Sequence, residues 1–183
     1  NAELMSKYVF DDEKLQWYKD EVAAGRLEVI PFAQMSKEVH AIIEEYDVEV
    51  FSAYNMGFDV RAVSDTAMSL KSGIFIDFDN EECWDLYHMA CHALQGNDNY
   101  VVACMENGLV SPSGNIKANA EAVYSFITNN FAVIEDHTAL SDAEIEADIM
   151  RWVLELEKEK QVYFKREIYS QAWRLVQRKK DKK

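Results

Sequence analysis

The sequence lacks the features that mark membrane, secreted and disulfide-stapled proteins. No run approaches the ~18 consecutive apolar residues that a membrane-spanning helix needs, and no signal-peptide pattern opens the chain. There are three cysteines, an odd number at irregular spacing, which argues against a disulfide framework. Free thiols fit a reducing compartment, so we expect a cytoplasmic protein that does not enter a membrane.

Internal repeats and low-complexity stretches are also missing, so the chain is not an array of repeated units. Of its 183 residues, 49% are hydrophobic and 12% aromatic, which argues against intrinsic disorder. This length suits one domain with a single core. We expect that domain to span residues 1–175 and a basic tail to span residues 176–183.

Positive charge is scarce over most of the chain, and the formal net charge is −14. Residues 158–183 carry ten Lys/Arg against three Asp/Glu, whereas the remaining 157 residues carry nine against thirty. The basic end has two interpretations: a solubilising, disordered tail, or a segment that steers phosphate groups toward an acidic body. An acidic body repels nucleic acid unless divalent cations bind first, so the second interpretation predicts a strong Mg²⁺ dependence.

A histidine and a carboxylate lie close together in residues 135–150. His137 is predicted just ahead of a helix, and Asp142 follows five residues later in its first turn, with Ser141 and Glu144 at the spacing of a capping box. The helix shows an apolar face with helical spacing, made of Ile145, Ile149, Trp152, Val153 and Leu156. A carboxylate is a hard ligand for Mg²⁺ or Mn²⁺, and a neutral imidazole can accept a proton from water near pH 7.

A second polar cluster follows a predicted strand. Val48 to Tyr54 reads as a short apolar strand, followed by a turn at Asn55 and Gly57 and by a helix that carries Asp59. A strand that ends in a polar turn and a helix-borne carboxylate commonly places ligands at the carboxyl edge of a sheet.

Together these two stretches resemble a known family. AYNMGFDVRAV is similar to the second motif, and EDHTALSD to the third, of the DEDDh 3′–5′ exonucleases, the group that includes the proofreading subunit of bacterial replicative polymerases. Several flanking segments resemble phage-type members, so the similarity covers nearly the whole chain: NAELMSKYVF, WDLYHMACHAL, ENGLVSPSGN and YSQAWRLVQR. The resemblance implies an α/β fold of the ribonuclease H-like type.

The family's first motif, Asp-x-Glu on an opening strand, has no counterpart in the first 47 residues. The chain also begins with Asn, so we expect a fragment that lacks the amino-terminal strands of the fold. An unpaired edge beside Val48, Val50 and Phe51 would then favour a homodimer or a complementing amino-terminal segment.

The resemblance implies a role for each matched residue. Asp142 would hold the metal that activates water, Asp59 would contact a second metal, and His137 would act as general base. Asn55 and Phe58 would contact a nucleic-acid substrate with a single-stranded 3′ end, and the cofactor would be Mg²⁺ or Mn²⁺. The alternative is a non-catalytic protein that keeps the exonuclease scaffold and binds nucleic acid or a partner.

The rest of the chain reads mainly as helices with one further strand. Helices are predicted over residues 11–24 with Leu15, Tyr18 and Val22 inward, and over residues 33–46 with Met35, Val39, Ile42 and Ile43 inward. We expect His40 at the surface and a strand from Ile74 to Phe78. Further helices are expected over residues 100–105, 118–131 and 142–160, with a turn at residues 111–115 and a final helix that contains Trp173.

The spacing of possible ligands suggests two other metal sites. Asp77, Asp79 and Glu81 alternate as in a calcium loop, but the glycine that such a loop needs is absent. Zinc could use members of a Cys/His group: Cys83, His88, Cys91, His92 and Cys104. No paired C-x₂₋₄-C ligands occur among them, so buried cysteines with surface histidines are the favoured reading.

Overall fold

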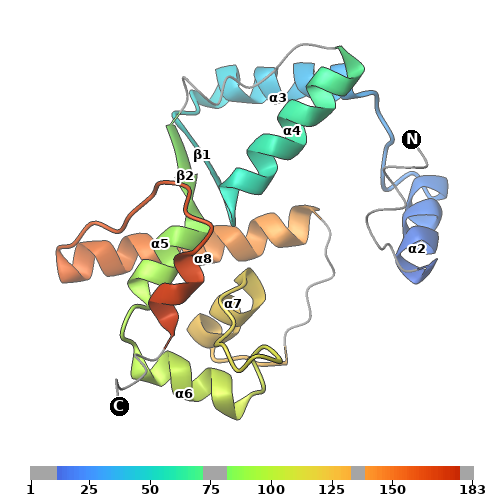
Figure 1. Ribbon diagram of the computed structural model, residues 1–183. Helices are drawn as coiled ribbons and strands as arrows, with labels where there is room; N and C mark the ends of the chain where they lie inside the picture. The colour runs from blue at the N-terminus through green and yellow to red at the C-terminus, as the bar shows by residue number, and fades with distance from the viewer. Residues whose placement is uncertain (1–11, 72–81, 133–138, 178–183) are drawn as a thin grey trace. The chain divides into compact units, whose positions relative to one another are not determined.

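The computed structural model describes residues 12–71, 82–132 and 139–177. The chain forms two compact units, Asn1–Tyr46 and Asp47–Lys183. The larger unit is of mixed α/β type, mostly helical, with a small two-stranded parallel sheet (Figure 1). Within the described ranges, no helix combines the length and the apolarity needed to cross a membrane.

The first unit contains the helices α2 (Asp12–Ala23) and α3 (Phe32–Tyr46), which confirms two predicted helices. α2 ends just before Gly25, whose φ of +68° suits the left-handed turn that follows. The predicted inward faces are only partly correct, because Val22 and Ile42 are 40% and 52% exposed. A unit of this size has little interior to offer, and no residue of α3 is fully buried. His40 is exposed, as expected.

The second unit begins with a β–α–β arrangement. Strand β1 (Val50–Ala53) confirms the predicted strand over a shorter span, and α4 (Met56–Leu70) follows it. Strand β2 (Glu82–Asp85) pairs with β1 in parallel, with Val50 opposite Glu82 and Ala53 opposite Asp85. Parallel pairing requires a crossover connection, and α4 lies in it. The strand predicted from Ile74 to Phe78 falls outside the described residues.

Five further elements follow in the described part of this unit, in chain order: α5 (Leu86–Ala93), α6 (Asp98–Glu106), α7 (Ala120–Thr128), α8 (Ala139–Lys160) and the 3₁₀ helix η1 (Ala172–Val176). The predicted helices over 100–105, 118–131 and 142–160 and the turn at 111–115 are confirmed within a few residues. Trp173 lies in a single 3₁₀ turn instead of the expected helix, and the Gln177 side chain donates to its carbonyl at 2.8 Å.

α8 begins before the predicted cap. Ser141 is its third residue, so the expected capping box is wrong. Ala139 and Leu140 are strong helix formers, which extends the helix toward the amino end. The predicted apolar face is confirmed, with Ile145, Ile149 and Val153 buried.

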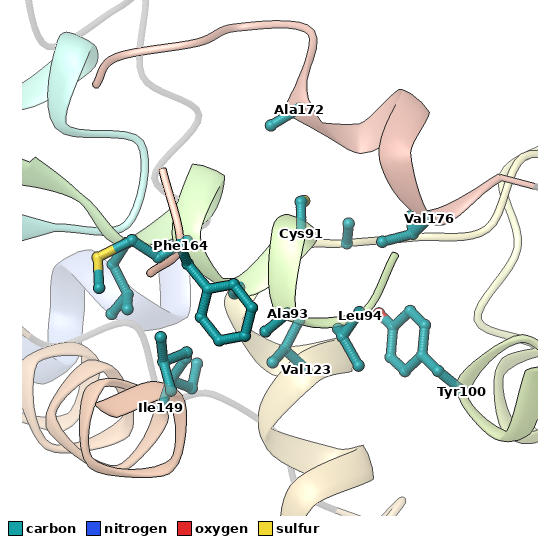
Figure 2. Packing of buried hydrophobic residues seen from close by; sticks show 14 of the residues in the cluster. Cys91, Ala93, Leu94, Tyr100, Val123, Ile149, Phe164, Ala172 and Val176 are labelled. Carbon is teal, nitrogen blue, oxygen red and sulfur yellow. The ribbon is translucent and has the colours of Figure 1, made fainter. Parts of the chain in front are cut away.

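The core is centred on α5, which packs against α8 and η1, while α7 packs against α8. Figure 2 shows side chains from these helices and from α6 gathered in one apolar interior, among them Leu94, Tyr100, Val123, Ile149 and Val176. Tyr100 is fully buried, and its hydroxyl donates to the Lys117 carbonyl at 2.7 Å, which satisfies the polar end of the ring.

Candidate functional site

The first part of the candidate site is the turn between β1 and α4. Asn55 adopts the left-handed conformation, with φ 71° and ψ 52°, which Asn tolerates better than most residues. Its carbonyl accepts the Phe58 N–H at 2.8 Å, so the helix begins immediately after the strand. The Asn55 side chain makes no capping bond, and Phe58 is 45% exposed. Both predicted substrate contacts therefore lie at the surface beside the end of β1.

Gly57 lies inside α4, which corrects the predicted turn position. It is buried, and a Cβ built on it would lie 2.8 Å from Cγ2 of Ile168. Ile168 therefore occupies the space that any larger residue would need.

Asp59 lies in the first turn of α4 and is half-buried. Negative charge is favourable at this end of a helix because the first N–H groups are unpaired. Burial nevertheless raises the pKa of Asp59 above its ordinary value; the charge of Asp85 raises it further, while backbone hydrogen bonding opposes the rise. Asp59 and Asp85 thus lie close enough for their charges to interact.

Asp85 was missed at the level of sequence. It is the last residue of β2, directly opposite Ala53, and is 1% exposed. Its carboxylate accepts the N–H of Tyr87 at 3.1 Å, which caps α5, and the N–H of Tyr169 at 3.2 Å. Burial raises the pKa of Asp85, although backbone N–H groups around it favour the charged form. Both oxygens are occupied, so we interpret Asp85 as a structural carboxylate that joins α5 to the chain around Tyr169.

Asp142 lies in the first turn of α8 and is half-buried. One of its carboxylate oxygens, Oδ1, is inaccessible and has no hydrogen-bond partner among the described atoms. An unpaired buried acceptor costs about 1–3 kcal/mol and requires an explanation. The first turns of α8 also face β1 and α5 across a cavity of about 220 Å³, lined by Ser52, Leu86, Ala143, Glu146, Ala147 and Met150.

His137 falls in residues 133–138, outside the described residues, so its pairing with Asp142 stays a prediction. The charge of Asp85 acts on Asp59, and residues of α8 line the same cavity as Ser52 of β1. No hydrogen bond between Asp59 and Asp142 is present in the described part of the chain.

The alternative zinc group does not assemble. Within the described ranges, no three or more His, Cys, Asp or Glu side chains gather as potential metal ligands. Cys91 and Cys104 are buried, as expected, and burial raises the pKa of both thiols, which disfavours the thiolate that zinc needs. His88 is 3% exposed, so its predicted surface position is wrong. Its Nδ1 hydrogen-bonds the Glu167 carbonyl at 2.7 Å, which makes burial possible. The calcium-loop residues Asp77, Asp79 and Glu81 lie outside the described ranges.

No family model matches the chain, and neither a curated protein nor a solved structure matches it.

Proposed function

We propose that this chain is a 3′–5′ exonuclease of the DEDDh type, with a ribonuclease H-like fold, that hydrolyses terminal phosphodiesters of nucleic acid with Mg²⁺ or Mn²⁺. The parallel β1–α4–β2 arrangement supports the proposal, because it places Asn55 and Asp59 after the carboxyl end of a strand. The observation that carries it is the buried, unpaired Oδ1 of Asp142.

The buried Oδ1 of Asp142 is unfavourable for folding but suitable as a metal ligand. A folded protein gains nothing from a desolvated carboxylate oxygen without a partner. A divalent cation would satisfy it, because carboxylate oxygens are the preferred ligands of Mg²⁺ and Mn²⁺. Asp142 therefore fits the role of metal ligand that the third motif implies.

A bound cation would lower the pKa of a coordinated water and stabilise negative charge on the phosphodiester. Asp142 would hold the metal that activates water, Asp59 would contact a second metal, and His137 would accept the proton of the attacking water. The exposed ring of Phe58 can stack on the terminal base, and the free side chain of Asn55 can hydrogen-bond the nucleotide. Two carboxylates form only a partial ligand set, so the complete site requires further oxygen ligands.

The charge of the chain fits a metal-dependent nuclease better than a simple nucleic-acid-binding protein. With a net charge of −14, the protein repels a polyanion at low ionic strength. Cations held at Asp59 and Asp142 would reduce this repulsion where the scissile phosphate binds.

The test is release of mononucleotides from a 3′-labelled single strand by the natural protein, including any sequence that precedes Asn1. We expect activity with Mg²⁺ or Mn²⁺ and none with chelator. Asp142→Ala should reduce the rate by more than about a thousandfold, roughly 4 kcal/mol of activation free energy. Glu144→Ala is the matched control, because Glu144 is an exposed carboxylate of the same helix turn. Equal activity of the two variants would refute the assignment of Asp142.

A second candidate function is non-catalytic binding of single-stranded nucleic acid on the same scaffold. It is favoured by the absence of a group of three or more potential ligands in the described ranges. This function predicts that a 3′-ended oligonucleotide binds in the presence of chelator and that Asp142→Ala binds equally well. Binding that requires Mn²⁺ and weakens in Asp142→Ala would exclude it.

A further inference from the structure

Residues 162–169 connect α8 to the chain leading into η1 and contain no regular secondary structure; we call them the return segment. The segment passes across α5 and the end of β2 (Figure 1), and the Asp85 N–H donates to the Arg166 carbonyl at 2.7 Å. A segment without its own helix or strand bonds must be held by its neighbours. Three sets of contacts do so.

The first set joins the segment to α8. Arg166 forms a two-pronged, buried ion pair with Glu157, with contacts of 2.9 and 2.7 Å. Its guanidinium also lies 4.3 Å from the ring centre of Trp84 and 3.6 Å from that of Tyr163. The Phe164 N–H donates to Glu157 as well.

The second set joins the segment to two histidines one turn apart on α5. His88 Nδ1 lies 2.7 Å from the Glu167 carbonyl, and the Lys165 N–H donates to His92 Nδ1 at 3.1 Å. The two rings stack with centres 6.5 Å apart, and the His92 ring meets Phe164 edge-on at 5.5 Å.

The backbone partners fix the proton on each ring, because a carbonyl only accepts and an N–H only donates. His88 must carry a proton on Nδ1, and it keeps that bond when its other nitrogen is also protonated. His92 must have an unprotonated Nδ1 to accept the Lys165 N–H. A proton on Nδ1 abolishes the hydrogen bond, because two N–H donors would then face each other. Acid therefore breaks the hydrogen bond at His92 and leaves the one at His88 in place.

We propose that the hydrogen bond from the Lys165 N–H to His92 is an acid-labile attachment of the return segment. This bond breaks when His92 takes up a proton, while the hydrogen bond between His88 and the Glu167 carbonyl remains. His92 is half-buried and borders a cavity of about 390 Å³ that it shares with His88, Lys165 and Glu167, so protons can reach it.

The charges around His92 come from two elements: α5 contributes His88, and the return segment contributes Lys165 and Glu167. Burial lowers the pKa of His92 below its ordinary value of 6.5, and His88 and Lys165 lower it further, while Glu167 opposes them. His92 is therefore neutral at pH 7. Because the pKa of His92 is lower in the folded protein than in the unfolded chain, the Lys165–His92 hydrogen bond contributes its full stabilisation above pH 6.5. Its contribution is lost as the pH falls from there through the folded pKa.

The third set links the return segment to the start of α4 and to the end of β2. Cγ2 of Ile168 lies where a side chain on Gly57 would project, and the Tyr169 N–H donates to Asp85. Opening the segment at Lys165 removes a restraint three residues before Ile168.

The experiment is residue-resolved amide hydrogen exchange by NMR on the whole chain, from about pH 7.5 to about pH 5, corrected for the intrinsic effect of pH on exchange. The Lys165 amide should lose protection by about threefold or more, with a midpoint that coincides with the titration of the His92 ring signals. Amides of Ile149 and Val153 in α8 should keep theirs over the same range.

Two variants separate the histidines. In His92→Asn, the side-chain oxygen takes the place of Nδ1 and accepts the Lys165 N–H without titrating, so the protection of Lys165 should become independent of pH. In His88→Asn, an amide N–H donates to Glu167, and the pH dependence should remain.

A Lys165 amide that stays protected while the His92 ring titrates would overturn the proposal. So would simultaneous loss of protection at Lys165, Ile149 and Val153, which would mean global unfolding. If His92→Asn does not fold, the coincidence of the two midpoints in the unmodified protein decides the question.

Discussion

The helical half of the larger unit, made of α5 to α8 and η1, is packed very differently from its sheet half, made of β1, β2 and α4. In the helical half, every element contributes fully buried side chains, and α5 alone buries six residues. In the sheet half, α4 is described throughout and buries only Met56, Gly57 and Ala67, while Asp85 is the sole buried residue of the two strands. The helical half therefore supplies the stability, and the sheet half presents polar groups near the surface.

This division suits a site that must bind charged ligands. Carboxylates that are kept for cation binding weaken the structure around them when no cation is bound. Of the two proposed ligands, Asp59 lies in the loosely packed half, where its charge disrupts little core, whereas Asp142 lies on α8 of the helical half. The comparison can be tested by substitutions on both sides of it.

The largest expected effect is at the buried ion pair of the helical half. Glu157→Gln removes the charge that compensates Arg166, whose side chain is 10% exposed, and should cost about 3–5 kcal/mol of unfolding free energy. Asp148→Asn, which removes the surface ion pair with Arg151 on the same helix, should cost about 0–1 kcal/mol. Urea denaturation of both variants measures the difference. Similar losses would show that the α8–Arg166 contact is no more buried in solution than the surface pair.

A leucine pair compares apolar packing in the two halves. Leu94→Ala removes a side chain that is 1% exposed and should cost about 2–5 kcal/mol. Leu70→Ala, at the end of α4, removes the same atoms from a position that is 58% exposed and should change stability by less than about 0.5 kcal/mol. Thermal and urea unfolding provide both values. A large loss in Leu70→Ala would mean that α4 is covered in solution.

The two halves also differ in how far the sequence predicted them. α8 was predicted because Ile145, Ile149 and Val153 repeat at helical spacing. β1 was predicted because Val50 and Phe51 lie in a short, mainly apolar stretch. β2 was missed because Glu-Cys-Trp-Asp has neither alternation nor an apolar run, and its strand geometry depends on pairing with β1.

The candidate site was predictable only where local pattern determines position. Asn55 and Asp59 were placed correctly after β1, because strand, turn and helix follow one another along the chain. Asp85 was not recognised, because its importance depends on the register that sets it opposite Ala53 and on the distant Tyr169 N–H. Burial of His88 likewise depends on a carbonyl 79 residues away.

Gly57 tests the contact between the return segment and α4. In a helix, Gly→Ala normally adds about 1 kcal/mol of stability. At Gly57 the new Cβ would lie 2.8 Å from Cγ2 of Ile168, so we expect Gly57→Ala to lower stability by roughly 1 kcal/mol instead. In an Ile168→Ala background the obstruction is gone, and the same change should be stabilising. A double-mutant cycle measures this change of sign in the stability effect of Gly57→Ala. The change of sign would be absent if Ile168, which is 50% exposed, moved aside to make room for the new Cβ.

The smallest expected effect is also the most informative about the candidate site. Burial and the charge of Asp85 raise the pKa of Asp59 above its ordinary value of 3.8, so the unfolded chain loses this proton at a lower pH than the folded protein does. Ionisation of Asp59 therefore lowers stability as the pH rises through this interval. Asp59→Asn should raise the unfolding free energy at pH 7 by about 0.5 kcal/mol, a value discounted for partial exposure to solvent. The gain should vanish below about pH 3.8, where Asp59 is protonated in both states.

Asp65→Asn, an exposed position of the same helix, controls for the general loss of one negative charge. A matching gain in Asp65→Asn would show that the effect comes from the net charge of the chain and not from the position of Asp59. If Asp59→Asn alone is more stable, the ionised carboxylate is retained at a cost to folding. Such a cost is expected of a residue that binds a cation, since proteins keep destabilising charges mainly where function needs them. The same variant should then bind Mn²⁺ more weakly than the unmodified protein, which isothermal titration calorimetry measures directly.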